Sequence, residues 1–398
     1  MNRFPIVRIL FLLGVMMSSA VAETAENYFE PITIDDAMPR AYQVAIADIN
    51  HDGKPDIAAL GEGKESGVVW YENPTWKRRP ISGGDLQDCI DLAFYDVDGD
   101  GELETAVASG FDLQNSKSGG QISWLKRNQD LAKPWTAYPI HAEPTAHRLR
   151  WVDSDGDGKK ELVVLPILGA GASAPQYDQA PARLLRFTVP AHPQTDPWPM
   201  EVIDQTQHLA HGLFIDSEHH IWTAGLEGIV RFSFKPNAMP RWDKQVVALG
   251  APKSEGRPGS SEIALGRLRD KSFVTSIDPW HGNQLAFYPM TAESRFPLER
   301  KVLDSSFDSG HALACADFDG DGDDEIIAGY RGTGYTIYLY DYDRQGTGNW
   351  KRVVIDRGGA AAQGFAVVDL NQDGLLDFVA GGGTTHNVKV YLNRFGKK

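Results

Sequence analysis

Five short segments of this chain of 398 residues share one acidic pattern, D-x-[DN]-x-D-G-x-x-[DE]. Oxygen atoms at positions 1, 3, 5 and 9, together with the carbonyl at position 7, can converge on one hard cation, and glycine at position 6 allows the sharp turn. The segments therefore predict up to five Ca²⁺ sites. The predicted side-chain ligands are Asp48, Asn50, Asp52 and Asp56; Asp96, Asp98, Asp100 and Glu104; Asp153, Asp155, Asp157 and Glu161; Asp317, Asp319, Asp321 and Glu325; and Asp369, Asn371, Asp373 and Asp377.

An EF-hand loop begins in the same way, so it is the first alternative. It also needs a glutamate at position 12 and a helix on each side. Position 12 instead lies in an apolar run in every copy, where it is Ala59, Val107, Val164, Ala328 or Ala380. The pattern thus indicates a strand, an acidic loop and a second strand. The loops that contain Asn50 and Asn371 are expected to bind calcium more weakly, because they carry one carboxylate fewer.

A second group of polar side chains precedes the acidic segments at nearly constant spacing. His147, His311 and Gln363 each lie six residues before the first aspartate of their segment, and His211 lies five residues before Asp216. These positions begin the apolar runs that lead into the acidic loops, so the side chains are expected at the opposite end of each strand. Tyr42, Asp88 and Glu262 occupy similar positions.

Histidines beside a carboxylate can hold a catalytic divalent metal or act as acid and base, and an arginine can stabilise an enolate or a carboxylate. A single histidine at a strand start is more often a packed or surface group, so this hypothesis depends on several of them converging on one site. The candidate catalytic residues are His147, His211, His311, Asp88 and Arg331.

Segments that are expected to connect second and third strands add candidates for ligand binding. Aromatic side chains there are candidate stacking platforms for a carbohydrate or contacts for a surface protein. One of these segments, residues 169–181, is a longer insertion. The candidate ligand-binding residues are Tyr42, Tyr177, Glu262, Trp280, His281, Tyr335 and His386.

The acidic segments mark a larger repeat that positions all of these groups. Two degenerate copies, near Asp216 and Gly266, complete a series of seven units that begin at residues 48, 96, 153, 216, 266, 317 and 369. Intervals of this length fit four short strands, which is one blade of a β-propeller. Six fourth strands follow the third strands, and the seventh is found at the front of the chain in residues 28–34.

The sequence therefore predicts an all-β, seven-bladed β-propeller of four-stranded antiparallel blades. The N-terminal strand is expected to complete the last blade, which would remove an exposed sheet edge. Residues 23–398 are expected to form this single domain. Residues 1–22 are expected to be a signal peptide that is removed, because basic residues precede a short apolar run and Ala20-Val21-Ala22 fits a cleavage site. The protein is then exported, to the periplasm or beyond the cell.

Composition narrows the range of partners. The formal net charge is −15, which argues against a nucleic acid or an anionic membrane surface as the partner. No further stretch is long and apolar enough for a membrane span. Cys89 and Cys315 belong to inner strands of non-adjacent blades, so we expect no disulfide and interpret both as buried packing residues. A monomer is expected.

The acidic loops and their strands resemble the FG-GAP/VCBS repeats of integrin-α-like propellers. This resemblance covers essentially the whole chain after residue 22 and implies that the calcium sites are structural. It also implies that the acidic loops lie on the face opposite the usual ligand face.

Three further segments look like the propeller domain of aldos-2-ulose dehydratase-like proteins. They are residues 145–151 (TAHRLRW), residues 311–317 with 329–332 (HALACAD and GYRG), and residues 385–390 (THNVKV). The resemblance implies elimination of water from a keto-sugar, which is the work of a carbon–oxygen lyase. The cupin domains of that family are not found, which puts any activity that needs them in doubt. The alternative is a non-catalytic module that binds a glycan or a protein. Convergence of the histidines would favour the enzyme, and a dispersed aromatic rim would favour binding.

Overall fold

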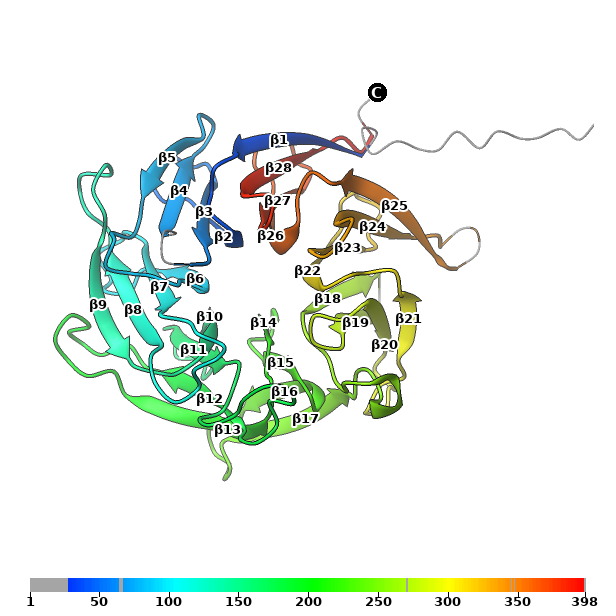
Figure 1. Cartoon of the computed structure of the whole chain (residues 1–398), viewed down its shortest axis with the longest axis horizontal. Coiled ribbons are helices and arrows are strands. Elements are labelled where there is room, and N and C mark those ends of the chain that lie inside the picture. The colour runs from blue at the N-terminus through cyan, green and yellow to red at the C-terminus, as the bar shows by residue number, and fades with distance from the viewer. Residues whose placement is uncertain (1–27, 64–66, 270, 345, 347, 397–398) are drawn as a thin grey trace, which may run out of the picture.

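The computed structural model describes residues 28–63, 67–269, 271–344, 346 and 348–396, and it is a ring of seven four-stranded antiparallel sheets (Figure 1). This confirms the predicted seven-bladed β-propeller. A short 3-10 helix, η2 (Lys253–Glu255), interrupts a loop. The predicted signal peptide, residues 1–22, lies outside the described residues. Within these ranges no helix combines the length and the apolarity that a membrane crossing requires.

Each blade runs from an innermost strand beside the central channel to a fourth strand at the rim. The innermost strands are β2 (Ala41–Ala47), β6 (Asp91–Tyr95), β10 (Ala146–Val152), β14 (Gly212–Ile215), β18 (Ile263–Leu268), β22 (Gly310–Ala316) and β26 (Ala362–Val368). The second strands are β3 (Asp56–Gly61), β7 (Glu104–Ser109), β11 (Glu161–Pro166), β15 (Ile221–Gly225), β19 (Lys271–Asp278), β23 (Glu325–Tyr330) and β27 (Asp377–Gly382).

The third strands are β4 (Val68–Glu72), β8 (Gln121–Lys126), β12 (Ala182–Phe187), β16 (Gly228–Phe234), β20 (Gln284–Met290), β24 (Thr336–Tyr342) and β28 (Asn387–Asn393). The fourth strands are β5 (Lys77–Pro80), β9 (Thr136–His141), β13 (Met200–Gln207), β17 (Trp242–Ala248), β21 (Lys301–Asp304), β25 (Trp350–Arg357) and β1 (Phe29–Asp35).

The second strands form the core of the ring. Every residue of β3, β7, β11, β15, β23 and β27 is buried, because neighbouring blades cover both faces of these strands. Their sequences are short, nearly continuous apolar runs, the pattern that indicates a fully buried strand. Rim strands such as β1 and β25 mix buried and exposed positions, and polar side chains occupy most of the exposed ones.

The first strand of the chain closes the ring, as predicted. Sheet order in the last blade is β1-β28-β27-β26, with Phe29 opposite Asn393 and Ile32 opposite Val390 (Figure 1). Both backbone edges of β28 are therefore hydrogen-bonded, and the array has no open edge at the seam.

A recurring side-chain pair ties neighbouring blades together. An aspartate on a fourth strand accepts a hydrogen bond from a tyrosine hydroxyl on the third strand of the next blade, and a basic side chain binds the same carboxylate. The three tyrosine-to-aspartate bonds are Tyr71 to Asp35 at 2.6 Å, Tyr340 to Asp304 at 2.7 Å and Tyr391 to Asp356 at 2.6 Å. The matching basic groups are Arg78, Arg352 and Lys389. The first pair connects the closing strand β1 to blade one.

Candidate active site at the channel mouth

Four polar side chains are turned into the channel by the same backbone irregularity. The pairing of the innermost strand with the second strand skips one residue near the start of β2, β10, β22 and β26. The skipped residues are Tyr42, His147, His311 and Gln363. A bulge of this kind leaves one residue unpaired and redirects its side chain, and bulges are common beside active sites. Strand alternation alone would not predict this orientation.

The other members come from loops at the same end of the ring. His211 and Glu262 directly precede β14 and β18. His281 lies in the loop between β19 and β20, and Arg331 directly follows β23. Because each acidic loop follows the far end of an innermost strand, these groups gather at the opposite end of the propeller from the acidic loops.

One hydrogen-bonded chain of side chains crosses this mouth. Arg331 Nη2 donates to His281 Nδ1 at 2.9 Å, and His281 Nε2 lies 3.2 Å from His211 Nε2. His211 Nδ1 lies 3.1 Å from Glu262 Oε1, and Arg148 Nη2 lies 2.5 Å from the same oxygen. A guanidinium can only donate, so the chain runs from Arg331 through His281 and His211 to the carboxylate.

A second chain centres on Tyr42. Its hydroxyl lies 3.1 Å from His311 Nε2 and 3.2 Å from His147 Nε2. His311 Nδ1 donates to the carbonyl of Gln363 at 2.5 Å, which leaves Nε2 as the acceptor. Tyr42 therefore donates to His311 and accepts from His147. The remaining nitrogen, His147 Nδ1, is buried and makes no hydrogen bond within the described part of the chain.

The four histidines are held neutral. Burial lowers the pKa of His147, His281 and His311 well below the usual imidazole range, and nearby positive charges lower it further. Burial also lowers the pKa of His211 to about 4, although Glu262 opposes this shift. Burial alone would raise the pKa of Glu262, but Arg148 and His211 outweigh it and lower that pKa to about 2. The site thus combines neutral imidazoles with one ionised carboxylate.

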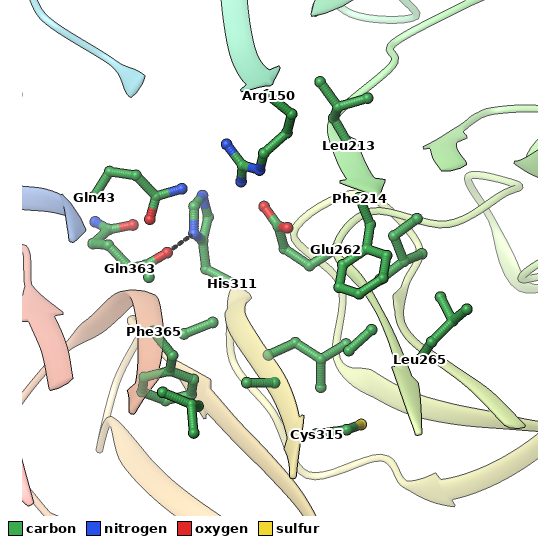
Figure 2. Close-up of a pocket in the computed structure, with 17 residues that line it drawn as sticks. Gln43, Arg150, Leu213, Phe214, Glu262, Leu265, His311, Cys315, Gln363 and Phe365 are labelled. Carbon is green, nitrogen blue, oxygen red and sulfur yellow. Dashed lines mark hydrogen bonds between the residues drawn. The ribbon is translucent and has the colours of Figure 1, made fainter. Parts of the chain in front are cut away.

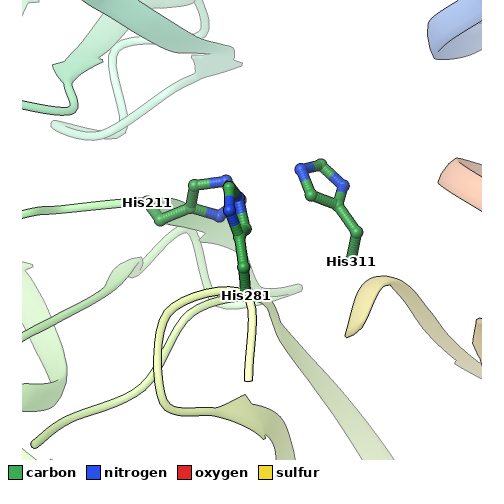
Figure 3. Close-up of side chains that lie close together, drawn as sticks. All are labelled: His211, His281 and His311. Atoms are coloured by element: carbon green, nitrogen blue, oxygen red, sulfur yellow. The ribbon is translucent and has the colours of Figure 1, made fainter. Parts of the chain in front are cut away.

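Three of the rings have the arrangement of a metal-binding group. Ligand atoms of His211, His281 and His311 all lie within 4.8 Å of one another (Figure 3). Neutral imidazole is a ligand for zinc and other divalent transition metals. His211 is oriented by the carboxylate of Glu262 and His311 by a backbone carbonyl, which are the outer partners that metal-bound histidines commonly have. These residues therefore fit a divalent transition metal.

A cavity of about 310 Å³ continues from this cluster into the channel. Figure 2 shows His311, Glu262, Gln363 and Arg150 at one end and apolar side chains such as Phe365 at the other. Cys315 lines the apolar end; it packs against an apolar cluster as predicted, but it is half-buried rather than buried. Cys89 is buried, and both thiols are free, as expected.

Not every predicted residue joins the cluster. Asp88 is half-buried and makes no contact with the histidines among the described residues, because β6 pairs with β7 without the bulge that redirects side chains in the other blades. His386 is exposed, and its Nδ1 accepts a hydrogen bond from Arg40 N–H. Tyr335 is half-buried and packs against the apolar cluster that blades five and six share.

Two of the predicted aromatic residues, Trp280 and Tyr177, lie beside the histidine cluster. The ring of Trp280 lies 4.3 Å from the ring of His281 and packs edge-on against Tyr177 at 5.6 Å. Tyr177 is buried, so its ring faces are not free for stacking. The guanidinium of Arg257 lies 5.0 Å from the Trp280 ring and 5.8 Å from the Tyr177 ring.

Two important arginines were not among the predicted residues. Arg148 follows His147 directly, and alternation would send it to the opposite face, but the bulge brings it into the channel, where it is 1% exposed. The adjacent His-Arg pair at a strand start was the available signal. Arg257 lies in the long loop after β17, and no pattern in the sequence indicated it.

The predicted calcium ligands come together in loops of one conformation. In all five loops the glycine N–H at position 6 donates to the first aspartate at 2.8–3.1 Å. The N–H at position 2 donates to the buried carboxylate at position 9 at 2.7–3.2 Å. Three loops bring three carboxylates within 4.8 Å of one another; these groups are Asp96, Asp98 and Glu104; Asp153, Asp155 and Asp157; and Asp317, Asp319 and Glu325.

These loops differ in how their charge is balanced by the protein. Lys126 Nζ lies 2.6 Å from Asp100 and also contacts Asp98, while Arg186 Nη2 lies 2.9 Å from Glu161 and contacts Asp155. The sequence pattern did not indicate either contact. In the loop of blade six, burial and the neighbouring Asp319 raise the pKa of Glu325 to about 9. A cation bound there would remove that repulsion, and carboxylate oxygens are the donors that calcium prefers.

Comparisons with known proteins agree with both predicted resemblances. A family model described as the β-propeller domain of aldos-2-ulose dehydratase matches residues 119–291, and one described as an FG-GAP-like repeat matches residues 48–107 and 317–380. The first match contains His147, His211, Glu262 and His281. Tyr42, His311 and Arg331 lie outside it.

Aldos-2-ulose dehydratase from Phanerodontia chrysosporium is 26% identical over 370 residues. The match covers 83% of this chain but 40% of that protein, so this chain spans less than half the length of its relative.

Solved structures share the architecture. Virginiamycin B lyase from Staphylococcus aureus has a TM-score of 0.55 at 10% identity, covering 92% of this chain and 98% of that one. The Cps50 (Swd1) β-propeller domain from Myceliophteria thermophila has a TM-score of 0.52 at 10% identity, also covering 92% of this chain and 98% of that one. At these identities the likeness concerns the fold alone.

Proposed function

We propose that the channel mouth is the active site of a sugar dehydratase, in which a divalent metal and a histidine–tyrosine pair remove water from an oxidised sugar. The observation that carries this proposal is the convergence of four histidines on one mouth, with His211 oriented by Glu262 at 3.1 Å. The similarity to a protein named aldos-2-ulose dehydratase supports a sugar as the substrate.

The metal would be held by His211, His281 and His311, and when bound it would polarise the sugar carbonyl and so acidify the neighbouring C–H bond. His147 is suited to accept that proton, since its Nδ1 is buried and has no partner among the described side chains. Tyr42 lies 3.2 Å from His147 and can donate its hydroxyl proton to the departing group.

The reaction is balanced without a further reagent. The C–H bond beside the keto group breaks and its proton goes to His147. A C=C bond forms, and the C–O bond on the next carbon breaks. The hydroxyl that leaves takes a proton from Tyr42 and departs as water. Transfer of the Nε2 proton of His147 to Tyr42, at 3.2 Å, returns both groups to their neutral forms, and exchange of the Nδ1 proton with solvent regains the starting tautomer of His147.

Incubation of the protein with an aldos-2-ulose such as 2-keto-D-glucose tests this proposal, because the dehydrated product is a conjugated enone that absorbs ultraviolet light. We expect His147→Gln and Tyr42→Phe to lower the rate about 100-fold or more, as for the loss of a general acid or base. Tyr138→Phe in β9, whose hydroxyl makes no hydrogen bond to the described residues, is the matched control. An inactive wild-type protein, or full activity in both site variants, would contradict the proposal.

A non-catalytic glycan-binding module is the second candidate, and the aromatic wall of Trp280 favours it. Trp280 is partly exposed beside His281 and can offer a face to a sugar ring. In that case Trp280→Ala would abolish glycan binding, while the dehydration assay would show no product with any variant.

We propose in addition that the acidic loops bind structural calcium and that the protein is exported. Support for calcium comes from the repeated loop geometry and from the three carboxylate groups that lie within 4.8 Å. Support for export comes only from the basic and apolar pattern of residues 1–22. We also expect neither a nucleic-acid partner nor obligate oligomerisation.

A further inference from the structure

The channel mouth contains a half-buried positive charge that no carboxylate of the described residues neutralises. Arg331 donates to the side-chain oxygen of Gln363 at 2.7 Å and to His281 at 2.9 Å, and both partners are neutral. Within the described part of the chain Arg331 forms no ion pair. The two other guanidinium groups in the channel are paired, Arg148 with Glu262 at 2.5 Å and Arg150 with Asp91 at 2.8 Å.

A second guanidinium, that of Arg257, contacts the same group of rings. Arg257 lies over the rings of Trp280 and Tyr177, and its Nη2 donates to the carbonyl of Pro175 at 2.7 Å. Among the residues that the structure describes, it also has no carboxylate partner. Trp280 and His281 connect the two arginines, since their rings lie 4.3 Å apart and Arg331 binds His281.

Two guanidinium groups without a carboxylate partner among the described residues are unusual in a chain that has more acidic than basic residues. The sequence has 54 acidic and 39 basic residues, and most other partly buried arginines described above are paired with a carboxylate. Removing a guanidinium from water without a counter-ion is costly, and arginine stays charged even when buried. A ligand that brings its own anion would satisfy both groups, and the planar guanidinium fits a carboxylate in a two-point contact.

We propose that the ligand of this mouth is an acidic sugar, whose carboxylate is bound by Arg331 with Arg257 at the entrance. This inference rests on the proposed function in that the same mouth binds the sugar, and it adds the class of sugar. The carboxylate distinguishes the ligand from a neutral keto-sugar of the kind that the relative's name describes. Arg331 is then a specificity residue beside the histidine cluster.

Binding of D-glucuronate and D-glucose, measured by isothermal titration calorimetry on the protein as purified, tests the proposal with two probes that differ only at C6. We expect the wild type to bind glucuronate about 10- to 100-fold more tightly, in line with one charge-assisted contact. Arg331→Gln should remove this preference, whereas Arg331→Lys should retain part of it. Arg257→Gln should weaken the binding of glucuronate more than the binding of glucose.

Arg79→Gln on the rim strand β5, where the arginine is paired with Glu72 at 2.6 Å, is the matched control and should behave as the wild type. Circular dichroism and thermal unfolding of each variant confirm that it is folded. Equal affinity for the two probes, no binding of glucuronate, or a preference that survives in Arg331→Gln would overturn the proposal. A preference that survives in that variant but disappears after metal removal would assign the carboxylate to the metal instead.

The failure of this inference is distinguishable from failure of the proposed function. A protein that dehydrates a neutral keto-sugar but does not prefer glucuronate would retain the proposed reaction and lose the acidic ligand. A protein that prefers glucuronate through Arg331 but dehydrates no sugar would retain the acidic ligand and lose the reaction.

Discussion

At the scale of single residues, the site depends on which nitrogen each histidine turns toward the mouth. His311 donates Nδ1–H to a backbone carbonyl, and His211 places Nδ1 beside the carboxylate of Glu262. Both contacts direct the other nitrogen toward the shared mouth, as outer partners do at metal sites. Glu262 is therefore a positioning residue, held in turn by Arg148 at 2.5 Å.

Replacement of Glu262 by glutamine should weaken binding of a divalent transition metal by about 10- to 100-fold, because the partner that orients His211 loses its charge. Competition with a chromophoric chelator measures this affinity. Calcium binding at the far end of the propeller should not change, which provides an internal control. Wild-type metal affinity in Glu262→Gln would show that the carboxylate does not orient the ring.

The sequence predicted the types and approximate places of these residues better than their orientation. Spacing before the acidic loops identified His147, His211 and His311, since a repeat of fixed geometry places equivalent residues at equivalent points. It could not predict the bulges at Tyr42 and His147, because one extra residue in a strand leaves no periodic signal. The error at Asp88 has the same origin.

At the scale of elements, blades are joined by buried tyrosine–aspartate pairs as well as by apolar packing. Asp304 and Asp356, on fourth strands, accept hydrogen bonds from Tyr340 and Tyr391 of the next blade at 2.7 and 2.6 Å. Burial raises the pKa of both tyrosines, and the neighbouring carboxylates raise it further, so each hydroxyl stays protonated and can donate. The pairs were not predicted, since their members lie 35 or more residues apart in the sequence.

Tyr391→Phe should lower the free energy of unfolding by about 1–2 kcal/mol, because it removes a hydrogen bond to a buried carboxylate and leaves the ring in place. Chemical denaturation monitored by tryptophan fluorescence measures the change. Tyr138→Phe is the control, as its hydroxyl makes no hydrogen bond within the described residues. An equal and small loss of stability in both variants would mean that the pair adds nothing between blades.

At the scale of the whole molecule, the propeller separates two kinds of polar chemistry. The acidic loops lie where innermost strands end, and the histidine cluster lies at the opposite end of the ring. The number of blades could be predicted from the spacing of the repeats. The closure by β1 could be predicted because the last blade otherwise lacks a fourth strand, and β1 supplies the missing hydrogen bonds at the edge of β28. The shape of the channel could not, since seven blades contribute to it from distant positions.

Element-resolved metal analysis of the purified protein, by inductively coupled plasma mass spectrometry, tests the central claim that the histidine end is a metal site separate from the calcium loops. The wild type and a His281→Ala/His311→Ala double variant are compared, with thermal unfolding to confirm that the variant folds. We expect about one equivalent of a transition metal in the wild type, its loss in the variant, and the same calcium content in both, since the imidazole and carboxylate sites are separate. Calcium alone in both proteins, or a transition metal that remains in the double variant, would contradict it.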